Sequence, residues 1–383
     1  MLGPLKQNSE RKGKHMRKGL KPFITAALGC ALLLPAVLAD AADYTKPVKI
    51  QDYLYETTCT NLDEKEGEDF TAKNIKNAVK AGCSSVRNGN FHGRNYDWSY
   101  DDTNEYVIHV PAEGGRHASV GVVSLVSGPD FMADSSKKPE DMLPYLPYMT
   151  LDGINDAHVV VNSNMSNSTY GPTTGSNPGK PRLNGMRVVR AILDNAGSVE
   201  EAVKLLQEHD VYMPAAFDLH YMISDPKETA VVEFINNKMH VDRNARVMTN
   251  YYVTLPYLQP DALGVERAEI LKVHYQEGNT KDGMIKLMDR ARASRVFEQD
   301  AVHLWVSEFA GSVLPGSDKK YTLLEADKIR EYMVPYLAKH KRVRNSGSMW
   351  QTVHCSVFDI ENLKLCVIAQ ENGIRHDFEL KQK

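Results

Sequence analysis

Cys83 and Arg94 are the two residues whose types and spacing best support chemistry. Between them lies Asn88-Gly89, a strong signal for a tight hairpin turn, because both central positions of a type I′ turn need positive φ. A turn at this dipeptide places Cys83 opposite Arg94 across the hairpin, with Cβ atoms about 5 Å apart. A fixed cation beside a thiol stabilises the thiolate and lowers the cysteine pKa, so the pair predicts a nucleophile that is active near neutral pH.

Asp97 follows on the second strand of this hairpin and is a candidate to hold an ammonium group or to orient the arginine. On a regular strand, residues 94 and 97 point to opposite faces, so both serve one site only where the strand bends or bulges. The alternative is a buried structural cysteine, with Arg94 and Asp97 in a surface ion pair. The spacing alone leaves both interpretations open.

Two runs frame the hairpin, Cys-Ser-Ser-Val at 83–86 and His-Gly-Arg-Asn-Tyr-Asp-Trp at 92–98. Together they resemble the nucleophile hairpin of the choloylglycine hydrolase superfamily of N-terminal-nucleophile (Ntn) amidases, which includes bile-salt hydrolases, penicillin V acylases and acid ceramidase. Further segments are similar to the family pattern and follow in its order, at residues 152–156, 159–164, 247–250, 293–297, 351–359 and 363–367.

The resemblance implies a role for each matched residue of the hairpin. Cys83 would be the nucleophile once its amino group is free. The α-amine, with a reference pKa of about 7.7 to 8.0, would accept the thiol proton, so no partner histidine is required. Asp97 would hold that amine, and Arg94 would favour the thiolate.

The resemblance also implies residues outside the hairpin. Asn250, together with Asn164 or a backbone N–H beside it, would stabilise the tetrahedral oxyanion. Asn162 is the alternative to Asn164 if the strand slips. Arg295 would be a second active-site arginine. The implied fold is α+β, the four-layer αββα sandwich of Ntn hydrolases.

The segment before Cys83 predicts export and processing. Basic residues precede an apolar stretch at 23–38 with small residues after it, a pattern typical of a secretory signal peptide over residues 1–39 and of a secreted or periplasmic protein. A membrane anchor is the weaker interpretation because Pro35 breaks a short apolar run, and Cys30 is a faint lipidation signal. Residues 40–82 are interpreted as a propeptide or N-terminal extension, with the catalytic domain at 83–383.

The end of that extension carries two further expectations. Gly82 would offer a small, exposed carbonyl for autocatalytic attack by the thiol. Cys59, in Thr-Thr-Cys-Thr at 57–60, is a rival nucleophile, but no Gly-Arg-Asn-x-Asp segment follows it at a workable distance.

Composition excludes several classes of protein. With 383 residues, 42% hydrophobic and 25% charged, the chain is of ordinary globular type. Its net charge of −3 argues against a nucleic-acid binder. The sequence shows no metal-ligand spacing, and we expect neither a metal nor a cofactor. Cys355 and Cys366 flank a predicted turn, but residue 355 would pair with 368, which does not favour a disulfide.

The remaining chain reads as helices and strands in separate blocks. Strands are predicted at 106–110, 119–126, 158–164, 219–223 and 230–235, and helices at 71–81, 185–195, 199–209, 266–277, 282–293 and 324–340. Loops at 127–147 and 169–182 offer apolar side chains for an acyl pocket, with simple cover of the core as the alternative; these side chains are Met132, Met142, Leu143, Tyr145, Leu146 and Tyr170.

We therefore expect an exported amidase that hydrolyses the linear amide C–N bond of a small-molecule N-acyl substrate. A bile-salt, penicillin V, N-acyl lactone or fatty-amide substrate remains open, and so does a homo-oligomer. Two alternatives are an acyltransferase on the same scaffold and a non-catalytic secreted binding protein. No stable membrane span is expected once the signal peptide is removed.

Overall fold

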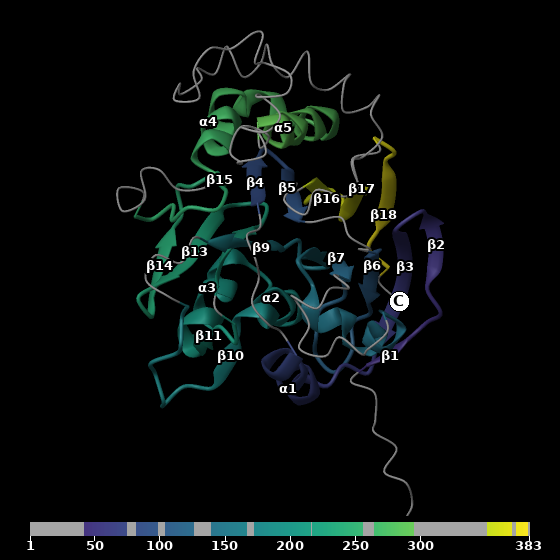
Figure 1. The fold of residues 1–383 in the computed structure, drawn as a ribbon, viewed down its shortest axis with the longest axis vertical. Helices are drawn as coiled ribbons and strands as arrows, with labels where there is room; N and C mark the ends of the chain where they lie inside the picture. Colours follow the sequence, from purple (N-terminus) through teal and green to yellow (C-terminus); the bar gives the residue numbers. More distant parts are fainter. Residues whose placement is uncertain are drawn as a thin grey trace, which may run out of the picture. The chain divides into compact units, whose positions relative to one another are not determined.

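The computed structural model of the protein describes residues 42–74, 82–98, 104–125, 139–166, 172–215, 217–255, 264–294, 351–369 and 373–381 (Figure 1). The predicted signal peptide, the helix predicted at 324–340 and Arg295 lie outside these ranges. Within them, no helix is both long enough and apolar enough to cross a membrane.

A ten-stranded sheet forms the larger layer. Its order is β1 (Asp43–Tyr44), β3 (Leu54–Thr60), β6 (Asn104–Val110), β7 (Ser119–Leu125), β8 (Asp152–Asn155), β9 (Val160–Ser166), β12 (Asp218–Ser224), β13 (Thr229–Ile235) and β14 (Lys238–Asp242), and β2 (Val48–Gln51) also pairs with β3. Strands β3 and β6 run parallel, and the other neighbours are antiparallel.

A six-stranded antiparallel sheet packs against the first. Its order is β15 (Val247–Met248), β4 (Gly82–Asn88), β5 (Phe91–Trp98), β16 (Gln351–Asp359), β17 (Lys364–Ala369) and β18 (His376–Glu379). Val107 and Ile154 of the large sheet share one buried cluster with Phe358 and Val367 of the small sheet. This shared cluster makes the two sheets a sandwich.

Helices cover the outer face of each sheet. On the large sheet, α2 (Val188–Asn195) and α3 (Val199–Glu208) bury their apolar faces against β9, β12 and β13, next to the short helix η2 (Gly185–Arg187). On the small sheet, α4 (Val265–Val273) and α5 (Lys281–Ser294), joined by η4 (Tyr275–Asn279), pack on β4, β16 and β17. The predicted α+β, four-layer αββα sandwich is confirmed. A small parallel pair, β10 (Arg182–Asn184) and β11 (Asp210–Tyr212), stands apart from both sheets.

The described part of the predicted propeptide is built into the large sheet. Residues 42–74 form β1, β2, β3 and the helix α1 (Glu64–Asn74), which packs on η1 (Pro139–Met149). Leu54 and Phe70 are buried. The helix predicted at 71–81 begins earlier, at Glu64. Strand β3 was not predicted, although Leu54–Thr60 is rich in β-branched and aromatic residues, which favour strands. Cleavage before Cys83 stays a prediction.

The proposed acyl-pocket loop covers the core instead. Met142, Leu143 and Leu146 of η1 are buried with residues of β6 and β7. Tyr145 stacks on Phe70 of α1, with ring centroids 3.9 Å apart. The structure therefore supports the alternative of core cover for these side chains. Met132 and Tyr170 lie outside the described residues.

Candidate active site

The hairpin of β4 and β5 forms as predicted, but its register differs by two residues. The turn lies at Gly89 and Asn90, and Asn88 pairs with Phe91. Gly89 takes a φ of 53°, which favours glycine at this position. As a result Cys83 stands opposite Tyr96, and Arg94 stands opposite Ser85. The predicted pairing of Cys83 with Arg94 is therefore wrong at the level of the backbone.

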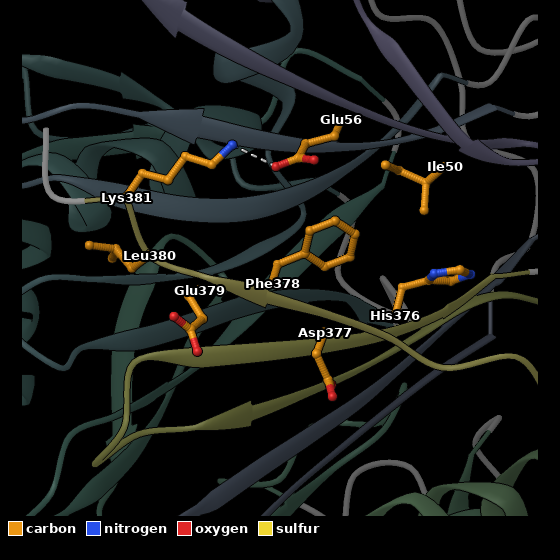
Figure 2. A pocket seen from close by; sticks show the side chains of 8 residues that line it. All are labelled: Ile50, Glu56, His376, Asp377, Phe378, Glu379, Leu380 and Lys381. Carbon is orange, nitrogen blue, oxygen red and sulfur yellow. Dashed lines mark hydrogen bonds and ion pairs between the residues drawn. The ribbon is translucent and has the colours of Figure 1, made fainter.

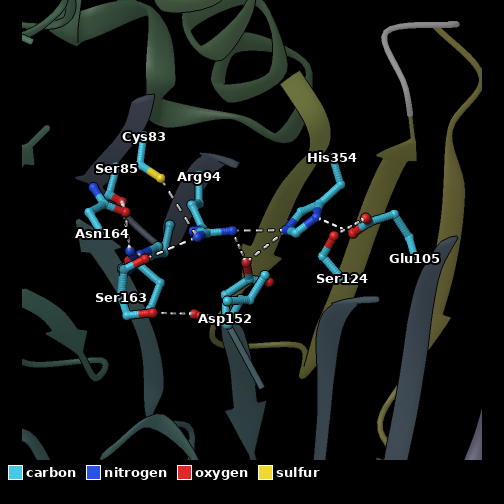
Figure 3. A network of polar contacts seen from close by, with 12 residues as sticks. Cys83, Ser85, Arg94, Glu105, Ser124, Asp152, Ser163, Asn164 and His354 are labelled. Atoms are coloured by element: carbon cyan, nitrogen blue, oxygen red, sulfur yellow. Dashed lines mark hydrogen bonds and ion pairs between the residues drawn. The ribbon is translucent and has the colours of Figure 1, made fainter. Parts of the chain in front are cut away.

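The side chains of Cys83 and Arg94 nevertheless meet. Strand residues two apart share a face, so both side chains lie on the face of β4 and β5 that meets the large sheet (Figure 3). The long arginine places Nη2 4.0 Å from Cys83 Sγ and donates to the carbonyl of Ser163 at 3.0 Å. Nη1 forms an ion pair with Asp152 Oδ2 at 2.7 Å. The guanidinium thus bridges the two sheets beside the thiol.

Asp97 also reaches the surroundings of Cys83. The bend of β5 that was expected between Arg94 and Asp97 does not disturb its pairing with β4, which runs without a shift from Gly82–Asp97 to Asn88–Phe91, so Asp97 lies on the opposite face of β5 from Arg94. The register of the neighbouring strand β16 does shift, between Thr352 and His354. Asp97 accepts a hydrogen bond from Thr352 Oγ1 at 2.7 Å. It pairs with Gly82 across the hairpin, next to the bond that processing would cut. Arg94 thus reaches the thiol of Cys83, whereas Asp97 lies on the other face of the hairpin, where Arg267 approaches it.

A second buried arginine, Arg267 of α4, completes this side of the site. Its Nη1 donates to the Cys83 carbonyl and, at 3.0 Å, to Ser84 Oγ, and it lies 3.8 Å from Asp97 Oδ2. Sequence reasoning assigned the second arginine to Arg295, which lies outside the described residues, and missed Arg267. A usable signal was present, because Arg267 stands on the apolar face of its helix, one residue before Ala268 and four before Leu271.

Asn250 contacts the backbone of Cys83 directly. Its Oδ1 accepts from the Cys83 N–H at 2.9 Å and from Arg267 Nη2 at 2.5 Å, and its Nδ2 donates to the carbonyl of Met165 at 2.6 Å. Gly264, at the start of α4, presses on this segment: a Cβ there would stand 2.9 Å from the Asn250 nitrogen. The tight approach of α4 therefore sets where Asn250 lies.

Asn164 and Asn162 both lie on β9, and both contact Ser85 of β4. Asn164 Oδ1 accepts from Ser85 Oγ at 3.2 Å, and its Nδ2 donates to the carbonyl of Met248 at 3.2 Å. Asn162 donates to Ser85 and Asn164, and its Oδ1 contacts His92 Nε2 at 2.7 Å. Asn164 thus links β4 to the end of β15, which leads to Asn250. Asn162, two residues earlier on β9, links β4 to His92 of β5 instead.

The protonation of Cys83 differs from the sequence expectation. The side chain is only 2% exposed. Burial raises the pKa of the Cys83 thiol, and although Arg94 and Arg267 lower it, the pKa stays above its usual value. The prediction of a lowered pKa is therefore wrong for the uncut chain, because desolvation outweighs a guanidinium 4.0 Å away.

The other described cysteines are free and buried. Cys59 packs in the cluster under α1, apart from the cluster that holds Cys83, and burial raises its pKa to about 12. Cys355 pairs with Ile368, as predicted, and forms no disulfide with Cys366. The described part of the chain holds no group of three or more His, Cys, Asp or Glu side chains placed to bind a metal ion.

Apolar side chains line the other side of the thiol. Cys83 shares a buried cluster with Tyr96, Trp98 and Val353, and the half-buried Leu151 and Met165 pack against it. A surface cavity of about 480 Å³ lies elsewhere, between β18 and residues of β2 and β3 (Figure 2). Glu56 and Lys381, which line it, form an ion pair. The lining of this cavity includes none of the site residues described above.

The sequence is similar to those of known proteins. Residues 83–259 match the sequence profile of the family described as linear amide C–N hydrolases, choloylglycine hydrolase family. Penicillin V acylase of Pectobacterium atrosepticum is 28% identical over 171 residues, which cover 41% of this chain and 44% of that protein. The chain therefore spans less than half the length of this relative.

Two solved structures are also similar. A mutant of conjugated bile acid hydrolase from Clostridium perfringens has a TM-score of 0.43 at 14% identity, with 79% of this chain and 93% of that chain covered. Penicillin V acylase from Agrobacterium tumefaciens has a TM-score of 0.40 at 19% identity, with 79% and 86% covered.

Proposed function

We propose that the protein is an amidase for small N-acyl substrates, with Cys83 as an N-terminal nucleophile, because residues 83–259 match the choloylglycine hydrolase family of linear amide C–N hydrolases. One observation carries the proposal: the residue at which the family match begins is the same buried cysteine that contacts Arg94, Arg267 and Asn250. The alternative of a surface ion pair does not hold, because Arg94 and Asp97 are both buried.

Activation requires cleavage of the Gly82–Cys83 bond. The thiol attacks the Gly82 carbonyl carbon, the C–N bond breaks, and the Cys83 nitrogen takes the proton that the thiol gives up. Water then hydrolyses the resulting thioester, which releases a Gly82 carboxylate and a free Cys83. The expectation of an exposed Gly82 is wrong: Gly82 is buried as the first residue of β4. Attack from the adjacent thiol needs no outside access.

Cleavage also changes the electrostatics of the thiol. The new amino group, as an ammonium, adds a positive charge to those of Arg94 and Arg267, and every cation near the thiol favours the thiolate. Asp97, next to the cut bond, balances that charge. Because the α-amine has a reference pKa of about 7.7 to 8.0, it then takes up and returns the thiol proton near neutral pH.

The hydrolytic step repeats the same chemistry on the substrate. The sulfur adds to the amide carbonyl, and the oxyanion accepts hydrogen bonds from Asn250 and from the Asn164 region of β9. The leaving amine takes the proton held by the Cys83 amine, and water hydrolyses the acyl-enzyme. Losing one oxyanion donor typically costs about 10² to 10³ in rate.

The apolar side chains beside the thiol favour an apolar acyl group. Trp98 and Met165 are among these side chains, and aromatic and thioether groups adapt well to flat or irregular apolar ligands. The relative named penicillin V acylase supports an aromatic acyl amide as the first substrate to try. Export to the periplasm or medium belongs to this proposal, since the signal peptide was predicted from sequence alone.

The decisive experiment combines intact mass with hydrolysis assays on the full-length protein. We expect an N-terminus at Cys83 and release of free amine from a panel that includes penicillin V, a conjugated bile salt and a fatty-acyl amide. Cys83→Ala should abolish both cleavage and hydrolysis, whereas the matched control Cys59→Ala, another buried free cysteine, should keep both. Cys83→Ala with full turnover would refute the proposal. Product analysis with an added amine separates hydrolase from acyltransferase.

A further inference from the structure

Three buried charged side chains stand behind Arg94. Figure 3 shows them with Cys83 on the opposite side of the guanidinium: Asp152, His354 and Glu105. Asp152 Oδ2 accepts a hydrogen bond from Arg94 Nη1 at 2.7 Å and lies 2.9 Å from His354 Nε2. On the far side of the ring, His354 Nδ1 lies 2.5 Å from Glu105 Oε2, and Ser124 Oγ donates to Glu105 Oε1 at 2.6 Å.

The group is balanced in charge only when His354 is an imidazolium. Burial would lower the pKa of His354, but Glu105 and Asp152 outweigh it and raise the pKa. Burial would likewise raise the pKa of Asp152, but His354 and Arg94 outweigh it and lower the pKa. Two anions and two cations therefore share a site with almost no solvent, which is the condition under which buried charges are tolerated.

The four residues come from both sheets. Glu105 and Asp152 lie on β6 and β8 of the large sheet, and Arg94 and His354 lie on β5 and β16 of the small sheet. Tyr96 pairs with His354 across β5 and β16, with ring centroids 5.3 Å apart. Two further titratable groups, His92 of β5 and Cys355 of β16, interact electrostatically with Asp152. The network thus ties the sheet that carries the thiol to the opposite sheet.

The position of the Arg94 guanidinium depends on one carboxylate oxygen that it shares with His354. Asp152 Oδ2 is contacted by Arg94 and His354 together, and Arg94 Nη1 and His354 Nε2 are only 3.0 Å apart. The ring therefore stops Arg94 from closing fully onto the carboxylate. Without it, the arginine is free to form a two-pronged pair with Asp152, which is its preferred geometry, and so to turn its Nη2 away from the sulfur.

We propose that His354 and Glu105 are positioning residues, which hold Asp152 and through it keep the Arg94 guanidinium against the thiol of Cys83. The proposal rests on the proposed amidase function, because it assigns these residues a part in activating its nucleophile. Neither residue touches the substrate or the reacting atoms.

The test compares His354→Gln and Glu105→Gln with the control His109→Gln. His109 forms a His–Glu pair of the same kind with Glu56, at 2.9 Å, on the neighbouring strands β6 and β3. Thiolate formation is followed by absorbance at 240 nm against pH, as the difference between each protein and its Cys83→Ala counterpart. For both test variants we expect the midpoint to rise by about one pH unit, which is about tenfold less thiolate below the midpoint. The control should match wild type.

Kinetics give a second readout. On the substrate found above, kcat should fall about tenfold in both test variants while KM stays within about twofold, since thiolate supply rather than binding is affected. A purely structural role would lower the melting temperature and leave the thiolate midpoint unchanged, and that result in folded variants would overturn the proposal.

Two further outcomes are also decisive. If the single variants fail to fold, the double variant Glu105→Gln/His354→Gln removes one charge of each sign, and its midpoint is expected to rise in the same way; an unchanged midpoint overturns the proposal. If the wild type hydrolyses no amide, the proposed function fails, while the thiolate measurement still decides the role of His354 and Glu105.

Discussion

Removing residues 42–81 should unfold the protein, whereas cutting the chain at the Gly82–Cys83 bond should leave it folded. Deletion of residues 42–81 takes away β1, β2, β3 and α1. Leu54, Leu62 and Phe70 of this segment are buried in the sandwich core or under η1. Burial of a large apolar side chain stabilises a fold by about 1.5 to 3 kcal/mol, so these three contribute about 5 to 9 kcal/mol. A typical domain has only about 5 to 15 kcal/mol in total.

The polar contacts of the segment add to this cost. Glu68 of α1 accepts from Tyr212 Oη at 2.6 Å, and Asn184 Nδ2 donates to Thr71 Oγ1 at 2.9 Å. Strand β3 also covers one edge of β6 by a parallel ladder from Leu54 to Thr58. Deletion would therefore leave an open sheet edge as well as an apolar face, and both promote aggregation.

The assay compares three preparations: the full chain, the chain 83–383 alone, and 83–383 expressed together with 42–82 as a separate polypeptide. We expect the second to be insoluble or unfolded by circular dichroism, and the third to form a two-chain complex on native mass spectrometry. Within the full chain, Phe70→Ala should cost about 3 to 5 kcal/mol in denaturant unfolding, whereas Val48→Ala, at a side chain 61% exposed, should cost little. A chain 83–383 that folds with the stability of the full chain would refute this reasoning and restore a dispensable propeptide.

Three other perturbations probe the site. Gly264→Ala should destabilise the fold and slow processing, because Gly264 has a φ of 95° and a Cβ would strike the backbone of Asn250; melting temperature and intact mass over time test this. Arg267→Met leaves buried partners of the arginine unpaired and should cost about 3 to 5 kcal/mol in denaturant unfolding, with Arg290→Met on α5, at a less buried ion pair, as the milder control. Burial lowers the pKa of His92 to about 4, so the unfolded chain gains a proton first as pH falls; stability should drop by about 3 kcal/mol between about pH 6.5 and 4, and His92→Gln should flatten that pH profile.

The local features of the site followed from sequence, and the register did not. A turn near Asn88-Gly89 and a cysteine near an arginine were predictable from short-range signals. The turn lies one position later than predicted, so each residue of β4 pairs with a residue of β5 two positions further along than expected. Asn88 is drawn into the strand because its Nδ2 donates to the carbonyl of Tyr275, and Asn90 donates to Glu361 at 2.6 Å. These partners are distant in sequence, so a prediction from the residues of the turn alone does not take them into account.

The residues that sequence reasoning missed act through contacts between distant segments. Arg267 meets Cys83, and His354 meets Glu105, across 184 and 249 positions of the chain. No periodicity or spacing encodes such pairs, although a charged residue on an apolar face gives a hint. The fold class was predictable because its blocks of helices and strands are local, whereas the place of 42–74 was not, since its charged composition resembles that of an extension.

The geometry around Gly82 indicates how the proposed cleavage would activate the site and leave most of the strand pairing in place. In the uncut chain, Gly82 occupies the position opposite Asp97, and the ladder continues from Cys83 opposite Tyr96. Cutting the Gly82–Cys83 bond gives up one pair at the strand end and keeps the rest. If Gly82 then moved away, Asp97 would lie beside the new ammonium group and could form an ion pair with it. The proposed cut would therefore create the α-amine that acts as the base, place it beside Asp97 and, when that amine is protonated, add a cation near a thiol whose pKa burial raises.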